Sequence, residues 1–302
     1  MENKKLFKGY AFIILSAVIF GLMPLMAKYV YADGVTPATM VLFRNLFSMP
    51  VLALLALSSK GSLKPSPKEL PKISLIAIMG CCLTPLLLFS SYNYIPSGTA
   101  TVFHFIYPAA VVLGELIFFH SKLGYGRIIS VIMCVGGIVL FYDPSSTTDP
   151  LGSMFALLSG LTYAIYIILL AGYKNKERSV FAFSFFVSAI STAVMLAVCL
   201  LTNQLSLPRS LFGWCLSIFF ALIVNVGAVV LFQRGTFLIG GSRASVLSTL
   251  EPITSVFAGV LFMSEKINVF TLIGTLLVIA ASVLIALCDI KQPKKEKEDQ
   301  DK

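Results

Sequence analysis

Residues 73–114 read ISLIAIMGCCLTPLLLFSSYNYIPSGTATVFHFIYPAAVVLG, and none of them is Asp, Glu, Lys or Arg. A membrane-spanning helix needs roughly 20 consecutive apolar residues, so this stretch is long enough for two such helices. A cluster of turn-forming residues from Asn93 to Gly98 divides it. The stretch therefore predicts two membrane helices joined by a short turn.

The rest of the chain has the same character. Of its 302 residues, 57% are hydrophobic and only 12% are charged, and the mean hydropathy is +0.90. An ordinary soluble domain carries about a quarter charged residues. The composition excludes a cytosolic enzyme, a secreted disulfide scaffold and a disordered protein. It predicts an all-α integral membrane protein.

Apolar windows between charged residues predict ten transmembrane helices. Their ranges are 9–27, 36–57, two within 73–114, then 126–142, 151–173, 180–201, 211–233, 242–263 and 269–287. The tail from Asp289 is rich in Lys, Glu and Asp, which is typical of a disordered segment.

The orientation follows from the basic residues, which account for the net charge of +9. With the N-terminus inside, nineteen of the 23 Lys and Arg residues fall on inner segments, and only Lys28, Arg209 and Lys266 fall outside. Cytoplasmic loops of membrane proteins carry such an excess of Lys and Arg. We therefore expect a multi-pass protein of the cell membrane with both termini in the cytoplasm, and no binding of nucleic acid.

The second half of the chain echoes the first at a shift of 144 residues. Segment 95–102 aligns with 239–246, and Pro108 falls on Pro252. Five spans per half is an odd number, so the two halves enter the membrane from opposite sides, as in many secondary transporters. This predicts ten transmembrane helices as two inverted five-helix repeats, 1–143 and 144–288, followed by a charged cytoplasmic tail, 289–302.

Several of these features together resemble the EamA-type ten-helix carriers of the drug/metabolite transporter superfamily. The residues that carry the resemblance are Arg44 in the second span, the helices with Pro108 and Pro252, and Ser264-Glu265-Lys266-Ile267 followed by Ile273-Gly274. The first half departs from the pattern, with His120-Ser121-Lys122-Leu123 where an acidic residue is common. The resemblance implies a carrier with two repeats, a central cavity and alternating access.

Two charged residues stand near the middle of predicted spans. Glu251 lies about ten residues into the ninth span and Arg44 about nine residues into the second. A charge at that depth costs several kcal/mol unless it faces a cavity or a partner. Glu251 is a candidate substrate or proton site, with a structural contact between helices as the alternative. Arg44 either pairs with Glu251, binds a carboxylate or phosphate of a substrate, or braces the bundle.

The two prolines predict a shared site. Pro108 frees the carbonyl of His104, and Pro252 frees that of Ser248, because proline has no N–H to donate. His104 and Tyr107 share a helix face, as do Ser248 and Glu251. We therefore expect these polar faces and free carbonyls to line a substrate cavity at the two prolines, which act as kinks.

Tyr163, Tyr166 and Asn225 are further candidates for the cavity lining. Glu115 is expected at the membrane interface, solvated or salt-bridged.

No catalytic or nucleotide-binding motif is present. The sequence contains no P-loop, GxSxG or HExxH, and none of its six cysteines has metal-ligand spacing with His. We therefore expect no enzyme activity, cofactor or metal.

The prediction is a secondary transporter for a small polar or amphipathic, amino-acid-like metabolite, acting as an exporter. A membrane receptor or assembly protein and an intramembrane lipid enzyme are the alternatives. Proton coupling and a homodimer stay open.

Overall fold

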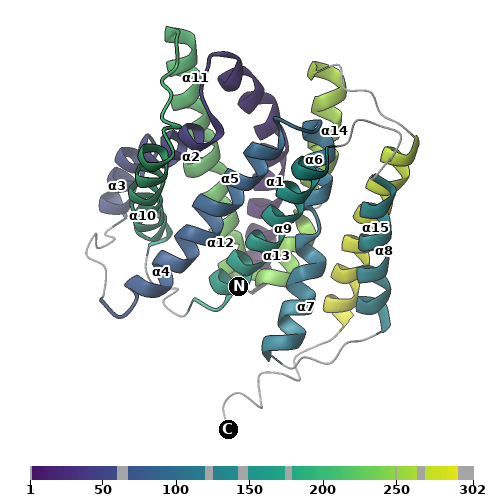
Figure 1. The fold of residues 1–302 in the computed structure, drawn as a ribbon. Helices are drawn as coiled ribbons and strands as arrows, with labels where there is room; N and C mark the ends of the chain where they lie inside the picture. The colour runs from purple at the N-terminus through teal and green to yellow at the C-terminus, as the bar shows by residue number, and fades with distance from the viewer. Residues whose placement is uncertain are drawn as a thin grey trace.

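The computed structural model describes residues 2–59, 67–119, 125–141, 149–173, 179–248, 250–263 and 269–291. Within these residues all regular structure is helical (Figure 1). The helices, with η for a π-helix, are α1 (Glu2–Ala32), α2 (Pro37–Leu46), α3 (Met49–Ser58), α4 (Leu70–Ile76), η1 (Ala77–Leu83), α5 (Thr84–Ser91), α6 (Ser97–His104), α7 (Tyr107–Phe119), α8 (Tyr125–Phe141), α9 (Pro150–Ala171), α10 (Val180–Leu201), α11 (Leu211–Ala221), η2 (Leu222–Val229), α12 (Val230–Ile239), α13 (Gly241–Leu247), α14 (Leu250–Met263) and α15 (Val269–Lys291).

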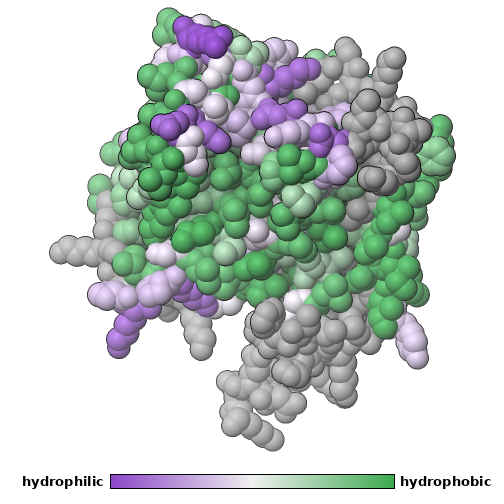
Figure 2. Space-filling view, viewed as in Figure 1, coloured by the Kyte–Doolittle hydropathy of each residue, from purple (hydrophilic) through white to green (hydrophobic). Residues whose placement is uncertain are grey.

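These elements form the predicted membrane helices. In the described part of the chain, eight helical stretches are long and apolar enough to cross a membrane, some of them built from successive elements. Two shorter apolar helices, Ile128–Gly137 in α8 and Leu272–Ala281 in α15, complete the set of ten. A broad apolar belt covers the visible face between two more polar ends (Figure 2). The prediction of an all-α membrane protein with ten membrane helices is confirmed.

The helices of one half of the chain pack against those of the other. α1 packs mainly on α12 and α14, while its counterpart α9 packs on α5, α6 and α7. α10 lies against α2 and α3, and α8 pairs with α15 at one side of the bundle (Figure 1). This reciprocal pairing is the pattern that two repeats related by a two-fold axis produce.

Local sequence explains where α2 and α9 begin. The Thr36 hydroxyl accepts a hydrogen bond from the Thr39 N–H (3.3 Å), and the Asp149 carboxylate accepts one from the Leu151 N–H (2.7 Å). A proline follows each cap at the first helical position, where its missing N–H has no helical partner to lose. Each helix start is thus specified by a capping residue and the proline after it.

The helices that carry Pro108 and Pro252 are interrupted rather than continuous. α6 ends at His104 and α7 begins at Tyr107, and α13 ends at Leu247 before α14 begins at Leu250. Each proline lies in the first turn of the second piece, a position that tolerates proline. The chain therefore leaves helical geometry at nearly equivalent places in the two halves.

Two π-helical segments form a second matched pair that the sequence pattern does not reveal. η1 divides α4 from α5, and η2 divides α11 from α12. They begin at Ala77 and Leu222, nearly the same shift that relates the two halves. Because a wider helix turn is less stable, π-helical turns are frequent at functional sites. Both segments supply residues to the site described next.

Candidate functional site

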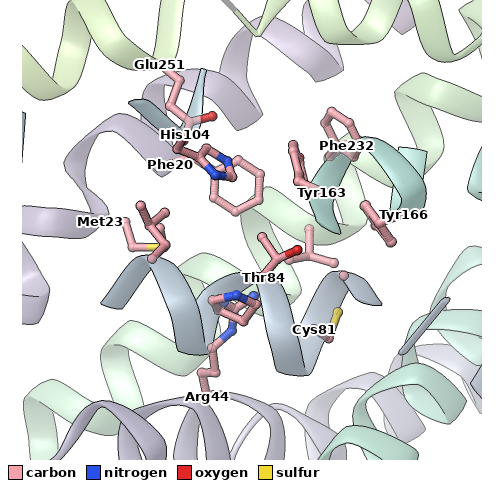
Figure 3. Close-up of a pocket in the computed structure, with 14 residues that line it drawn as sticks. Phe20, Met23, Arg44, Cys81, Thr84, His104, Tyr163, Tyr166, Phe232 and Glu251 are labelled. Atoms are coloured by element: carbon pink, nitrogen blue, oxygen red, sulfur yellow. The ribbon is translucent and has the colours of Figure 1, made fainter. Parts of the chain in front are cut away.

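A pocket lies between α1, α2, α5, α6, α9, α12 and α14 (Figure 3). Its atom-free space is about 480 Å³, part of which is open to solvent. Five of the predicted site residues line this pocket: Arg44, His104, Tyr163, Tyr166 and Glu251. The other three, Tyr107, Ser248 and Asn225, are buried but are not among the lining residues.

Arg44 enters the pocket from α2 and is held in place by Asn225 of η2. The Arg44 Nε donates to the Asn225 Oδ1 at 2.9 Å, and the Asn225 amide donates back to the Arg44 carbonyl oxygen at 2.8 Å. The same amide also donates to the Asn45 Oδ1 at 3.1 Å. Asn225 therefore orients the guanidinium, while the terminal NH₂ groups of Arg44 have no hydrogen bond to the described residues and face the pocket.

Glu251 lies at the opposite end of the pocket from Arg44 (Figure 3). Both side chains are only 4% exposed. The first turn of α14 carries Glu251, where the partial positive charge of a helix N-terminus favours a carboxylate. Among the residues that the structure describes, Arg44 and Glu251 form no ion pair, so direct pairing is not how this conformation accommodates the two charges.

His104 has a defined hydrogen-bonding pattern. Its Nδ1 lies 2.8 Å from the Ser159 hydroxyl, and that hydroxyl donates its own hydrogen to the Ala156 carbonyl oxygen at 2.6 Å. Because a hydroxyl has one hydrogen, Nδ1 must be the donor to Ser159. The Nε2 of a neutral His104 is then a hydrogen-bond acceptor on a ring that lines the pocket near the Glu251 end (Figure 3).

Of the two carbonyl groups predicted to be free, one accepts a hydrogen bond within the fold. The Ser248 carbonyl oxygen accepts a hydrogen bond from the Glu251 N–H at 2.9 Å, so the prediction that it is unpaired is wrong. The His104 carbonyl packs directly against Gly160 of α9, where a side chain would collide with it. The hydrogen bond from the Glu251 N–H to the Ser248 carbonyl forms because the chain makes a tight turn between α13 and α14. The Ser248 carbonyl is therefore not a free acceptor for a ligand.

Tyr107 and Ser248 support the pocket from behind. The Tyr107 hydroxyl lies beside Ser248 and Glu251, yet it makes no hydrogen bond of normal geometry to any described residue. The Tyr107 ring meets the Tyr163 ring edge to face, with centroids 4.8 Å apart. Tyr107 thus joins the Glu251 end of the pocket to its aromatic wall.

Three aromatic rings form that wall. Tyr163 stacks on Tyr166 at 5.5 Å, and Phe232 contacts both rings at 5.7 and 6.2 Å. Gly80 of η1 packs on the Tyr166 ring, and a side chain there would collide with it. The wall therefore requires glycine in η1, just as Arg44 requires Asn225 in η2.

Sequence reasoning missed several lining residues. They include Phe20, Met23, Cys81, Thr84 and Phe232. Phe20 and Met23 share a face of α1 by their spacing, but the same spacing is found wherever helices pack. No sequence signal separates these pocket residues from packing residues.

Some residues of interest fall outside the described part of the chain. These are the family-motif segment 264–267, the departing segment 120–123 and the tail beyond Lys291. The side chain of Glu115 is likewise outside it. Among the residues that the structure does describe, no three His, Cys, Asp or Glu side chains come together in a way that could hold a metal ion.

The fold and the pocket together define a class of protein. An all-α bundle crosses the membrane many times and holds, in its interior, a pocket with one cationic and one acidic side chain. Interior charges of this kind in membrane proteins mark pathways for solutes or ions.

The chain belongs to the EamA-like transporter family, whose model matches residues 7–143 and again residues 150–287. It is 24% identical to the uncharacterized transporter YcbK of Bacillus subtilis, over 88% of each chain. It is 22% identical to the uncharacterized inner membrane transporter YicL of Salmonella typhimurium, over 93% of this chain and 95% of the relative. One solved crystal structure shares the fold, with a TM-score of 0.70 at 16% identity, over 94% of this chain and 99% of the other. The protein is thus a multi-pass membrane transporter.

Proposed function

We propose that the protein is a secondary transporter that exports a small zwitterionic metabolite of the amino-acid kind across the cell membrane. The observation that carries the proposal is the pair of buried side chains Arg44 and Glu251, which face one pocket from opposite ends without pairing (Figure 3).

Electrostatics favours a ligand that carries both charges. A buried charge without a partner loses its hydration and gains little in return. A substrate carboxylate can take up the two free NH₂ groups of Arg44 as a bidentate pair, the geometry that guanidinium groups prefer. A substrate ammonium can bind the Glu251 carboxylate at the other end. One zwitterion therefore neutralises both charges, whereas an amine or an acid alone neutralises only one.

Glu251 also suits proton exchange. A carboxylate can hold a proton or an ammonium group but not both with full strength, so binding of one displaces the other. Outward transport of the substrate is then driven by proton entry. The free Nε2 of His104, which faces the same pocket, is placed to receive or return that proton.

The interrupted helices supply the moving parts of an alternating-access cycle. The breaks between α6 and α7 and between α13 and α14 flank the pocket through His104 and Glu251. Backbone irregularity within a membrane is tolerated where it lines protein or a cavity. A change of angle at either break moves one side chain of the site and opens the pocket toward one side of the membrane.

The decisive experiment measures flux. Proteoliposomes containing the protein are loaded with a radiolabelled mixture of the common L-amino acids, and release is followed with and without an inward proton gradient. We expect release that the gradient accelerates and that zwitterions compete for. Decarboxylated amines and deaminated acids are the matched controls and should compete poorly. Equal competition by the single-charge analogues contradicts the role given to the paired charges, and absence of flux contradicts transport of amino acids.

Cys81 offers a binding assay on the same protein, because it is a native thiol that lines the pocket. A transported zwitterion should slow its reaction with a small methanethiosulfonate reagent. A Cys81→Ser variant gives the background from the other cysteines. Labelling that no amino acid slows contradicts binding in this pocket.

The proposed orientation has its own test. Single cysteines at position 64 and in the charged tail should react with an impermeant reagent only from the cytoplasmic side, and one at position 147 only from outside. External labelling of the tail contradicts both the ten-span topology and the cytoplasmic C-terminus.

A further inference from the structure

A second polar cluster lies next to the aromatic wall, outside the pocket. It consists of Ser184 of α10 with Gln233 and Thr236 of α12, all of them at most 2% exposed. The Ser184 hydroxyl lies within hydrogen-bond distance of both the Gln233 Oε1 and the Val180 carbonyl oxygen, and its single hydrogen can serve only one of them. None of the three lines the pocket, but Phe232, the neighbour of Gln233, and Tyr166 both do. The cluster therefore adjoins the Tyr166–Phe232 pair without lining the pocket itself.

Two of its polar atoms lack a hydrogen bond. The Gln233 amide nitrogen and the Thr236 hydroxyl have no partner of normal geometry among the described residues. The Gln233 side chain interacts with the Tyr166 hydroxyl, so its hydrogen bonding depends on the position of a pocket ring. A buried polar group without a partner is costly, and native proteins rarely keep one unless water or a ligand pairs with it in some state. The amide nitrogen can only donate, and the hydroxyl can donate as well as accept, so an acceptor is a partner that suits both.

The position of the cluster suits a route for the substrate between the pocket and one end of the bundle. Thr236 lies one turn beyond Phe232 on α12, toward the end of the bundle at which α9 and α12 end and α10 begins. Further toward that end, Tyr173, Phe183 and Phe237 pack together, with Tyr173 and Phe183 centroids 4.8 Å apart. The cluster thus lies between two aromatic layers, one that closes the pocket and one near the end of the bundle.

We propose that Gln233 and Thr236 form a second, weaker binding site that receives the carboxylate of the substrate when the Tyr166–Phe232 pair moves aside. The proposal rests on the proposed function, because it takes the transported zwitterion as the ligand. The cluster offers neutral donors, which hold a carboxylate less tightly than a guanidinium does. A path needs such a site, since binding must be strong enough for entry and weak enough for release.

A matched pair of variants tests the transport role. Thr236→Val keeps the shape and removes only the hydroxyl, whereas Thr236→Ser keeps the hydroxyl. We expect Thr236→Val to slow release of the radiolabelled L-amino acid mixture by about three- to tenfold, the factor for one lost hydrogen bond. Its unfolding temperature should be unchanged or higher, since a costly polar group is gone. Normal flux in Thr236→Val, or a loss of flux with a lower unfolding temperature, overturns the proposal.

A substrate-independent measurement keeps this proposal separate from the identity of the cargo. In membrane vesicles, Thr236→Cys should react with an impermeant methanethiosulfonate reagent, because a site on the path becomes wet during the cycle. Ser217→Cys is the control, since Ser217 is equally buried on α11, outside the pocket lining. If the wild type moves no amino acid but Thr236→Cys reacts, only the proposed cargo fails. If Thr236→Cys is as inert as Ser217→Cys, the second site is wrong whatever the substrate.

Discussion

The two halves of the molecule share a backbone plan but differ in the side chains that face the pocket. Both halves have a π-helical segment and an interrupted helix at closely corresponding positions. At the shift of 144 residues, however, Arg44 corresponds to Ser188, and Glu251 corresponds to Tyr107. The difference teaches that conformational change and substrate recognition can be separated. A duplicated backbone allows the bundle to open to either side of the membrane. A ligand with two unlike ends, however, needs different side chains in the two halves.

The same contrast holds within the π-helical segments. Gly80 of η1 makes room for the Tyr166 ring, whereas Asn225 of η2 holds Arg44. In both halves the π-helical backbone brings one residue close to the pocket. The role of that residue, making room for a ring or holding Arg44, depends on its side chain and not on the backbone.

Among the substitutions that test the difference between the two halves, we expect the largest loss of transport at Arg44. Arg44→Gln should reduce zwitterion transport by about 30-fold or more, since losing one partner of a desolvated charge pair costs at least about 2 kcal/mol. Folding should survive, because the variant removes a buried charge that has no ion-pair partner in the free protein. Transport kinetics and an unfolding curve in detergent measure the two effects. Ser188→Ala, at the corresponding position, is the control and should leave transport nearly unchanged.

Glu251 should give the next largest effect. Glu251→Gln cannot exchange a proton, so we expect it to fold normally and to lose the acceleration of transport by a proton gradient. The corresponding change in the first half, Tyr107→Phe, removes only a hydroxyl and should retain that acceleration. Flux measured at a series of pH values distinguishes the two variants. A Glu251→Gln protein that still responds to the gradient rules out this carboxyl as the coupling site.

A change at Gly160 tests the scaffold instead of the ligand site. Gly160 packs on the His104 carbonyl, whereas the aligned position in α1, at a shift of 143, is already Ala17. Gly160→Ala should destabilise the protein by about 1–3 kcal/mol, because overpacking forces the two helices apart. Thermal unfolding in detergent measures the loss. Ala17→Gly, the reverse change in the other half, should instead cost only about 0.5–1 kcal/mol through helix propensity. Equal effects at the two positions contradict the close contact.

The smallest effect concerns the ends of the two first helices. Beyond α1, hydrogen bonds from Ser210 hold the pKa of Asp33 below its usual value of 3.8. A lowered pKa means that the stabilisation is present above pH 3.8 and is lost as the pH falls through the folded-state pKa. At the end of α9, Lys72 donates to the Gly172 carbonyl, a contact that involves no carboxylate. Wild type should therefore be more stable than Asp33→Asn at neutral pH, and this difference should shrink below pH 4. The difference in stability between wild type and Lys72→Met should not shrink. Unfolding temperatures at pH 7 and pH 3 provide the comparison, and parallel behaviour of the two variants contradicts it.

Prediction from the sequence worked where a single residue property was enough. The depth of Arg44 and Glu251 in apolar spans placed both in the interior, because a charge tolerated there needs a cavity or a partner. The same reasoning failed for the Ser248 carbonyl, which accepts from the Glu251 N–H at 2.9 Å. A proline shows that one hydrogen bond is missing, but not which neighbouring donor replaces it.

The sequence by itself determined the all-α membrane class, the ten helices and the correspondence between the halves, because hydropathy and repeat spacing are local properties of the chain. Only the tertiary structure decided which polar residues reach the pocket. Asn225 and Arg44 are 181 residues apart, yet one fixes the other, while Tyr107 is fully buried and does not line the pocket. Contacts between distant helices depend on their packing angles and on π-helical turns, and these are set by the sum of many small packing terms that no residue pattern displays.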